Sequence, residues 1–386
     1  MSIVTQKWEE ILLKQTFRIY SLFVAAGASK LRIKYNAHIQ MKIVFRTDAS
    51  ASLGTGHVMR CLTLAESLKR VGAEVIFICA KNNGDMTGFL EERGYEVGRI
   101  NKPYGSGFLD DAEQTVAHIK NSGVKPDWLV VDNHALDNRW KSIIRPDTGK
   151  IMVIDDLADR PHDCDLLLDQ NYYERTDRYK NLTPKKCKLL LGPEYALLRE
   201  EFYHARQGLE KRSGNAQRIL ISMGGADSSN ETAKALEAIR MVNLSDISVD
   251  VVTGAANPHA DMIREMCHSM LRTNYHHAVD NMAKLMATTD LAIGSVGVAT
   301  WERLCVGLPA IVIVTAKNQI EHTRSVESTG AIINLGWYSD VTPADIGAAI
   351  THLLADRSRL VKMSEEGMKY VDGAGVNKVC GEMLGN

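Results

Sequence analysis

The 386-residue sequence has no excess of charge of either sign. Its 46 Lys and Arg residues are balanced by 47 Asp and Glu residues, which leaves a formal net charge of −1. Without a basic surplus or a stripe of Lys and Arg, the sequence offers no electrostatic basis for nucleic-acid binding, and we expect no nucleic-acid partner. A local basic cluster for a phosphate group stays open.

Paired cysteines are also absent. The seven cysteines are odd in number and contain no Cys-x-x-Cys spacing, which excludes a disulfide framework or a zinc ribbon and indicates a reducing compartment. The run His162-Asp163-Cys164-Asp165 has metal-ligating residue types, but adjacent positions do not easily converge on one tetrahedral ion. We therefore expect no metal site and no cofactor.

Long apolar runs are missing as well. No segment is apolar over the ~20 residues that a membrane span needs. The best candidate, residues 19–26, is too short and follows Glu9 and Glu10. It is a poor signal peptide because the residues before it are not cleanly basic and no convincing cleavage site follows. We expect a cytoplasmic protein without membrane contact.

The chain length favours two domains, because 386 residues are many for one hydrophobic core. Residues 1–40 do not resemble the start of a fold, whereas residues 41–46 predict a buried strand. The first forty residues are expected to be an N-terminal extension outside the fold, or an upstream start whose true initiator is Met41. The polar stretch 206–218 is the best linker. We expect a first domain over 41–210 and a second over 215–386.

Strand-like and helix-like segments alternate from Met41 onward, which is typical of parallel sheets covered on both faces. In the first half we predict a helix from about residue 58 and strands over 42–45, 74–79, 128–131, 150–154, 166–168 and 188–191. In the second half we predict helices over 230–242 and about 358–384, and strands over 218–223, 249–253, 291–293 and 310–314. The pattern indicates an α/β fold with two successive Rossmann-like domains.

The first candidate site is the glycine-rich turn of residues 54–60, Gly-Thr-Gly-His-Val-Met-Arg. Glycines such as Gly56 let the backbone approach a ligand, and the start of a helix offers free N–H groups to an anion. A dinucleotide fingerprint needs glycine where Met59 stands, and a P-loop needs Gly-Lys-Ser/Thr. His57 remains, at the carboxyl end of a strand where α/β sheets bind ligands, with Arg60 on the same helix face. From local pattern alone, a loop histidine bonded to backbone is an equally open interpretation.

Two further glycine-containing loops follow predicted strands in the second half. Gly224 and Gly225 would bring backbone amides close to a ligand, although such a pair often serves only a turn. Ser295, Gly297 and Thr300 surround a predicted helix start, where hydroxyl and N–H groups can hold a diphosphate.

Three polar residues lie further along the same part of the chain. The carboxylate of Glu302 could accept both hydroxyls of a ribose, or it could be a solvated helix residue; its neighbour Trp301 is interpreted as packing. Asn318 and Gln319 follow the next predicted strand and place amide side chains at the same sheet edge.

Six segments together resemble a known family. They are Gly54-x-Gly56-His57-x-x-Arg60, Asp155-Asp156-Leu157-Ala158-Asp159-Arg160, Asp169-Gln170-Asn171, Gly192-Pro193-Glu194-Tyr195, Gly224-Gly225-Ala226-Asp227 and Thr300-Trp301-Glu302. In this order and spacing the chain from Met41 onward resembles the UDP-2,4-diacetamido-2,4,6-trideoxy-β-L-altropyranose hydrolases of pseudaminic acid biosynthesis.

The resemblance implies a glycosyltransferase-B-like fold, with two Rossmann-like domains facing a central cleft and UDP held mainly by the second. It implies that His57 activates water, which attacks the anomeric carbon of a UDP-sugar with inversion and C–O cleavage, without a metal. A monomer is the expectation. The implied substrate contacts are Gly56, Arg60, Asn133, His134, Gly224, Gly225, Ser295, Gly297, Thr300, Glu302, Asn318 and Gln319.

The sequence departs from the family at His134, in Asp132-Asn133-His134-Ala135-Leu136-Asp137, where the resemblance predicts tyrosine near the sugar. The departure concerns substrate contacts and not the reaction class. A lone base suits this chemistry, because UDP is a stable leaving group that needs no acid, and histidine has a pKa near the working pH. Three alternatives stay open: a glycosyltransferase-B-type transferase, a non-catalytic nucleotide-sugar-binding subunit, and a hydrolase of another sugar or nucleotide.

Overall fold

A computed structural model describes residues 41–50, 53–101, 107–123, 125–244 and 246–385. The expectations for residues 1–40 lie outside the described residues. The described residues, which begin at Met41, belong to one compact unit that contains two parallel sheets. The domain division at residues 210–215 therefore stays a prediction.

The first sheet has seven strands in the order β3-β2-β1-β4-β5-β6-β7, all parallel. The strands are β1 (Lys42–Thr47), β2 (Glu74–Ala80), β3 (Glu96–Ile100), β4 (Trp128–Asp132), β5 (Lys150–Ile154), β6 (Leu166–Asp169) and β7 (Lys188–Leu191). Every residue of β1 and β4 is buried, as expected for central strands covered on both faces.

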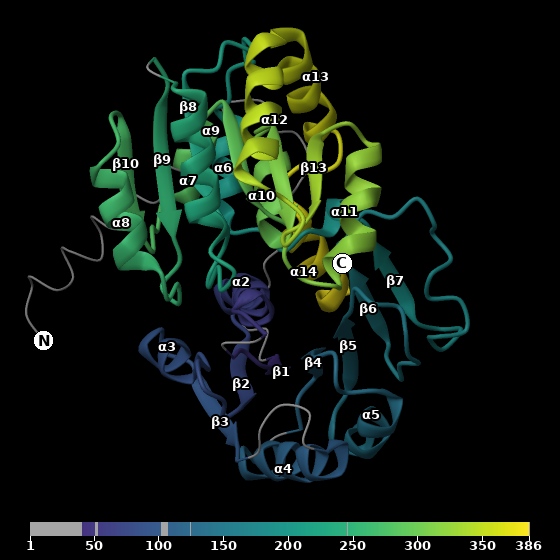
Figure 1. The fold of residues 1–386 in the computed structure, drawn as a ribbon. Helices are drawn as coiled ribbons and strands as arrows, with labels where there is room; N and C mark the ends of the chain where they lie inside the picture. The colour runs from purple at the N-terminus through teal and green to yellow at the C-terminus, as the bar shows by residue number, and fades with distance from the viewer. Residues whose placement is uncertain (1–40, 51–52, 102–106, 124, 245, 386) are drawn as a thin grey trace, which may run out of the picture. The chain divides into compact units, whose positions relative to one another are not determined.

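Helices connect these strands as crossover elements. They are α2 (Gly56–Arg70), α3 (Thr87–Glu92), α4 (Phe108–Asn121), α5 (Asn138–Ile144) and, after β7, α6 (Glu200–Gln207), with short 3₁₀ turns at Arg145–Asp147 and Pro193–Tyr195. Helix α2 begins two residues earlier than predicted and buries its apolar face, including Val58, Leu62 and Leu68, against the sheet. In Figure 1 α2 lies between the two sheets.

The second sheet has six parallel strands in the order β10-β9-β8-β11-β12-β13. The strands are β8 (Arg218–Ser222), β9 (Ser248–Thr253), β10 (Thr273–His277), β11 (Leu291–Ser295), β12 (Ala310–Val314) and β13 (Ile332–Trp337). The helices are α7 (Glu231–Val242), α8 (Ala260–His268), α9 (Met282–Ala287), α10 (Val298–Cys305), α11 (Gln319–Ser328), α12 (Pro343–Ala355), α13 (Arg357–Met368) and α14 (Gly375–Leu384).

The end of the chain differs from the prediction. The single helix expected over about 358–384 is wrong, because α13 ends at Met368 and α14 begins at Gly375. Gly373 has a φ of +80°, and a side chain at Gly375 would place its Cβ 2.3 Å from the carbonyl oxygen of Ala196. Helix α14 then packs on α2, so the last residues join the hydrophobic core of the first half (Figure 1).

The predicted linker is held in place by two arginines. Arg206 donates to the carbonyls of Cys305 and Met368, and Arg212 donates to carbonyls near the ends of α9 and α10, including that of Val306. None of the helices described is both long enough and apolar enough to cross a membrane.

Candidate active site

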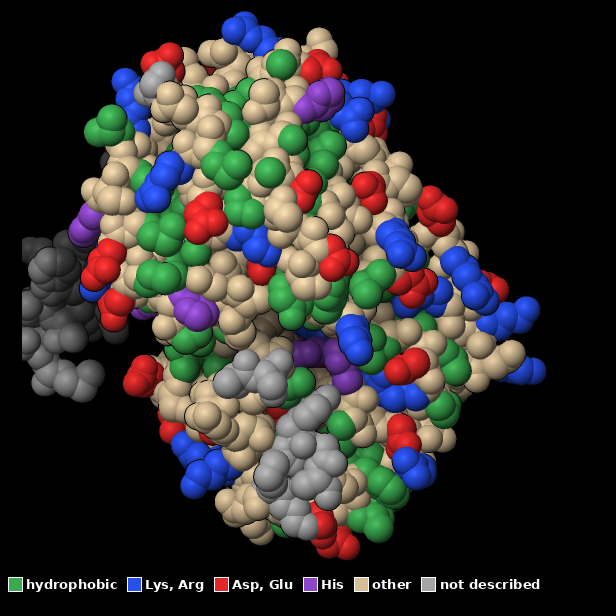
Figure 2. Space-filling view, in the orientation of Figure 1, with side chains coloured by type: hydrophobic (Ala, Val, Ile, Leu, Met, Phe, Trp, Pro, Cys, Tyr) green, Lys and Arg blue, Asp and Glu red, His purple; other side chains and the backbone are tan. Residues whose placement is uncertain are grey.

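A cavity of about 670 Å³ lies where loops at the carboxyl ends of both sheets meet. The first half contributes the loop after β1, including Gly54–Gly56, and the first turns of α2. The second half contributes Gly224–Ala226 after β8 and Ser295–Ala299 after β11. Figure 2 shows histidine side chains gathered where this face of the molecule is hollowed. The position is the one where α/β sheets bind ligands.

The two glycine loops approach each other across this cavity. A Cβ added at Gly225 would lie 3.0 Å from the hydroxyl of Thr55, and a Cβ at Gly254 would lie 2.3 Å from the carbonyl oxygen of Gly225. Gly224 and Gly297 have φ values of +85° and +133°, which favour glycine. The glycines therefore meet a steric and conformational need at the cavity wall.

His57 is held by Asp132, the last residue of β4. Because β1 and β4 pair in parallel with Thr47 opposite Asp132, the end of β4 lies beside the turn that begins α2. His57 Nδ1 lies 2.7 Å from Asp132 Oδ1, and the His57 side chain is 16% exposed. His57 is not one of the residues that line the cavity, but its neighbours Gly56 and Arg60 are.

Arg60 fixes the same carboxylate. Its Nε and Nη2 donate to the two oxygens of Asp132 at 2.5 and 2.6 Å, a bidentate arrangement in a fully buried position. Burial alone would raise the pKa of Asp132, but the charges of Arg60 and His57 outweigh it and hold the pKa well below its usual range.

The ionised Asp132 determines the tautomer of His57. Arg60 Nη2 also lies 3.0 Å from His57 Nδ1, but one ring nitrogen cannot both donate to Asp132 and accept from Arg60. The shorter contact, 2.7 Å to a carboxylate, assigns the proton to Nδ1. Nε2 of His57 is then the basic nitrogen. It has no hydrogen-bond partner among the described residues.

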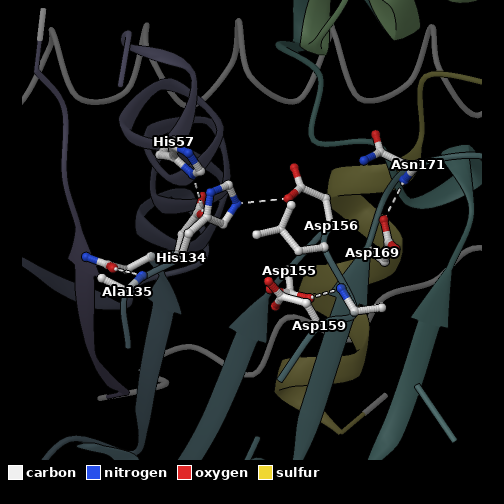
Figure 3. Close-up of polar contacts among 12 residues, drawn as sticks. His57, His134, Ala135, Asp155, Asp156, Asp159, Asp169 and Asn171 are labelled. Carbon is white, nitrogen blue, oxygen red and sulfur yellow. Dashed lines mark hydrogen bonds and ion pairs between the residues drawn. The ribbon is translucent and has the colours of Figure 1, made fainter. Parts of the chain in front are cut away.

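His134 forms a second histidine–carboxylate pair beside the first. Its Nε2 lies 2.8 Å from Asp156 Oδ1, and its ring meets that of His57 edge to face with centroids 4.7 Å apart. Figure 3 shows the two rings next to each other, with His134 directed at Asp156. Burial lowers the pKa of His134, but the hydrogen bond and charge of Asp156 outweigh it, so the pKa is raised above its usual value.

Asn133 is engaged inside the protein. Its Nδ2 donates to Asp48 Oδ2 at 2.7 Å, and its Oδ1 accepts from the backbone N–H of Ala135 at 2.8 Å. Because the side chain is buried and uses both polar atoms, the structure gives Asn133 a role in tying the loop after β4 to the loop after β1. It does not bring Asn133 to the cavity lining.

Of the residues predicted around the start of α10, some line the cavity and one does not. Ser295, Gly297 and Glu302 line the cavity, and Ser295 donates to the carbonyl of Met223 at 3.0 Å. Thr300 does not line it, because its side chain is fully buried and accepts a hydrogen bond from Arg303. The Thr300 hydroxyl is thus engaged inside the protein, and its contact to a ligand stays a prediction.

Gln319 lines the cavity, but its amide is used within the loop after β12. Its Oε1 accepts from the N–H groups of Thr315 and Ala316, and its Nε2 donates to the carbonyl of Val296. Gln319 thus joins the β12 loop to the loop after β11. Asn318 is exposed and does not line the cavity.

Sequence reasoning gave no role to three residues that the structure places at the site. Asp132 and Asp156 follow predicted strands within quoted motifs, and their position at strand ends is the signal that could have identified them as partners of His57 and His134. Arg199 lines the cavity and lies 3.3 Å from Glu302, and no local pattern marks it. Among the described residues no group of three His, Cys, Asp or Glu side chains could hold a metal ion.

Sequence comparisons relate both halves to known proteins. Residues 218–375 match the family model of the glycosyltransferase family 28 C-terminal domain. An uncharacterized protein of Methanocaldococcus jannaschii is 29% identical over 73% of this chain, which spans 57% of that relative. The UDP-2,4-diacetamido-2,4,6-trideoxy-beta-L-altropyranose hydrolase of Campylobacter jejuni is 29% identical over 72% of this chain and 93% of its own.

A structural comparison concerns the fold. The crystal structure of Acinetobacter baumannii MurG matches with a TM-score of 0.63 at 14% identity, covering 90% of this chain and all of that one. With the two parallel sheets, this similarity confirms the predicted glycosyltransferase-B-like α/β fold.

Proposed function

We propose that the protein hydrolyses a UDP-linked 2,4-diacetamido-2,4,6-trideoxy hexose to the free sugar and UDP, in pseudaminic acid biosynthesis. The similarity to the hydrolase of Campylobacter jejuni, over most of both chains, supports the substrate class. The observation that supports the reaction is the pairing of His57 with the ionised Asp132 beside a cavity lined by loops of both parallel sheets.

The proposed step needs one base. His57 Nε2 takes a proton from water while the water oxygen forms a bond to the anomeric carbon of the sugar. The bond between that carbon and the β-phosphate oxygen breaks, and its electron pair leaves with UDP. Attack opposite the leaving group inverts the anomeric centre. The proton on Nδ1 stays hydrogen-bonded to Asp132, which stabilises the imidazolium that forms.

In this proposal, residues of the second half of the chain stabilise the UDP leaving group. Helix α10 begins at Val298, and the loop Ser295–Gly297 before it lines the cavity together with Gly224 and Gly225. Free N–H groups and the positive end of the helix dipole favour a diphosphate there. Because UDP leaves as a stable anion, the site needs no acid comparable to the two carboxyl groups of glycosidases.

A second candidate is a transferase that passes the sugar to an acceptor other than water. The match of residues 218–375 to a glycosyltransferase family favours it. The two candidates share the nucleotide site and differ in the nucleophile, so the product distinguishes them.

The test incubates the protein with UDP-sugars in water labelled with oxygen-18. Label in the free sugar supports attack at carbon, label in UDP means attack at phosphorus, and turnover only after an acceptor is added supports a transferase. His57→Ala should abolish turnover and leave UDP affinity within a few fold. A matched control is His276→Ala, because His276 also lies 2.8 Å from a buried aspartate, Asp250, but it belongs to β10, no residue of which lines the cavity, whereas Gly56 and Arg60 beside His57 do. Near-normal turnover by His57→Ala would refute the mechanism.

A further inference from the structure

Arg303 is a buried cation without an ionic partner. Its side chain is 1% exposed, its Nη2 donates to the carbonyl of Ser295 at 2.8 Å and to the hydroxyl of Thr300 at 3.3 Å, and its Nε has no partner. Among the described residues no carboxylate lies within ion-pair distance of it. Burial lowers the pKa of Arg303 to about 10, so the guanidinium still carries its charge at neutral pH.

Two other buried arginines, Arg46 and Arg60, are neutralised by carboxylates. Arg46 is paired with Asp48 at 2.6 Å, and Arg60 is paired with Asp132 at 2.5 Å. A buried charge without a counter-charge is unfavourable, because water no longer solvates it. Within the described residues, Arg303 has two hydrogen-bond acceptors and, beyond ion-pair distance, the charge of Glu302.

The guanidinium of Arg303 lies at the start of its own helix α10, where the positive end of the helix dipole disfavours a further positive charge. It donates to the carbonyl of Ser295, in the loop before α10, and to the hydroxyl of Thr300, in the first turn of α10. Its Nη1 also lies 2.9 Å from the position that a Cβ at Gly294 would take. The positive charge of Arg303 and the positive end of the α10 dipole thus lie together at the start of α10.

The start of α10 forms part of the cavity wall. Ser295, whose carbonyl accepts from Arg303, lines the cavity, and so do Gly297 and Val298 at the start of α10. Because the guanidinium donates to the backbone of a residue that lines the cavity, a bound anion there would be within the range of its field.

We propose that Arg303 is a positioning residue that strengthens diphosphate binding from behind the loop 295–297, through its charge and not by contact. The inference rests on the proposed function, because it takes the ligand of this loop to be a nucleoside diphosphate. It accounts for the missing counter-charge: the diphosphate itself neutralises Arg303 when it binds.

A charge effect is distinguished from a structural effect by its dependence on ligand charge. Calorimetry would measure the affinities of uridine, UMP and UDP for the wild type, Arg303→Met and Arg303→Gln at low ionic strength. In both variants we expect at least about a tenfold loss for UDP, a smaller loss for UMP and a change of less than about twofold for uridine. Arg303→Gln keeps a donor for the carbonyl of Ser295 and serves if the methionine variant does not fold.

Arg212→Met is the matched control. Arg212 is also largely buried without a carboxylate within ion-pair distance in the described part of the chain, but it donates to carbonyls near the ends of α9 and α10 and lies outside the cavity lining. Its loss should not change the UDP-to-uridine affinity ratio. Equal losses for all three ligands in the Arg303 variants, or unchanged UDP affinity, would overturn the inference about Arg303 but not the proposed function. A wild-type protein that binds none of the ligands would overturn the proposed function as well.

Discussion

Replacing Asp132 by Asn removes one negative charge from the centre of the site at nearly constant volume. Asp132 is fully buried and accepts from His57 at 2.7 Å and from Arg60 at 2.5 and 2.6 Å. In the variant one of the two oxygens becomes an NH₂ group that faces a donor. Arg60 is left with Asp156, at 3.6 Å, as its remaining carboxylate.

Two magnitudes follow for Asp132→Asn. Breaking a buried ion pair on one side lowers the free energy of unfolding by about 3–5 kcal/mol. Losing the correct histidine tautomer lowers kcat by about 10³- to 10⁴-fold, which corresponds to roughly 4–5.5 kcal/mol in the activation free energy. Turnover is measured as the release of UDP from the nucleotide sugar, with protein that circular dichroism shows to be folded.

The pH dependence of the stability loss has a definite sign. Because folding lowers the pKa of Asp132, its contribution is present above the unfolded pKa of about 3.9 and is lost as the pH falls toward the folded value. The difference in unfolding free energy between wild type and Asp132→Asn should therefore be constant near neutral pH and shrink below about pH 4. Urea unfolding at several pH values measures it.

Asp250→Asn is the control for this prediction. Asp250 is also fully buried and accepts from an arginine, Arg218, at 2.6 Å and from a histidine, His276, at 2.8 Å. Neither of these partners lines the cavity, whereas Arg60, the partner of Asp132, does. Asp250→Asn should lower the free energy of unfolding by less than Asp132→Asn does, because the partners of Asp250 are about one third exposed. It should leave turnover unchanged. Turnover of Asp132→Asn within tenfold of wild type, or an equal loss in Asp250→Asn, would refute the reasoning.

Two further predictions concern neighbouring residues. Folding raises the pKa of His134, so the stability that its pair with Asp156 provides is present below about pH 6.5 and is lost as the pH rises through the raised value. His134→Gln should therefore lower the unfolding free energy more at pH 6 than at pH 9, and equal losses at both would contradict the pair. Glu302→Ala should weaken UDP binding by about tenfold and reduce discrimination between UDP and its 2′-deoxy form, because the proposed ribose contact is lost. Unchanged affinity in calorimetry would remove that role.

The fold could be predicted from the sequence where strands are buried on both faces. Residues 151–154 and 310–314 are continuous apolar runs, and the strands predicted around them match β5 and β12 of the structure. The strands β3, β10 and β13 were missed because they lie at sheet edges and are partly exposed, which breaks the apolar run that marks a buried strand.

The site could be predicted in part. Glycine turns after strands indicated the cavity, because the need for positive φ and close approach is visible in residue type. Which side chains face the cavity was less predictable: Asn133 and Thr300 have suitable polar groups, yet internal partners, Asp48 and Arg303, engage them. Hydrogen-bond partners distant in sequence are not encoded in local pattern.

The sequence by itself determined the α/β class, the order of strands and turns, and the placement of His57 at a strand end, because apolar runs and glycine positions are local properties of the chain. Only the tertiary structure decided that His57 pairs with Asp132, 75 residues away, and that α14 returns to the first half. It also decided that Arg303 is buried without a counter-charge. These features depend on which strands lie side by side, and parallel pairing brings together residues that no sequence window contains.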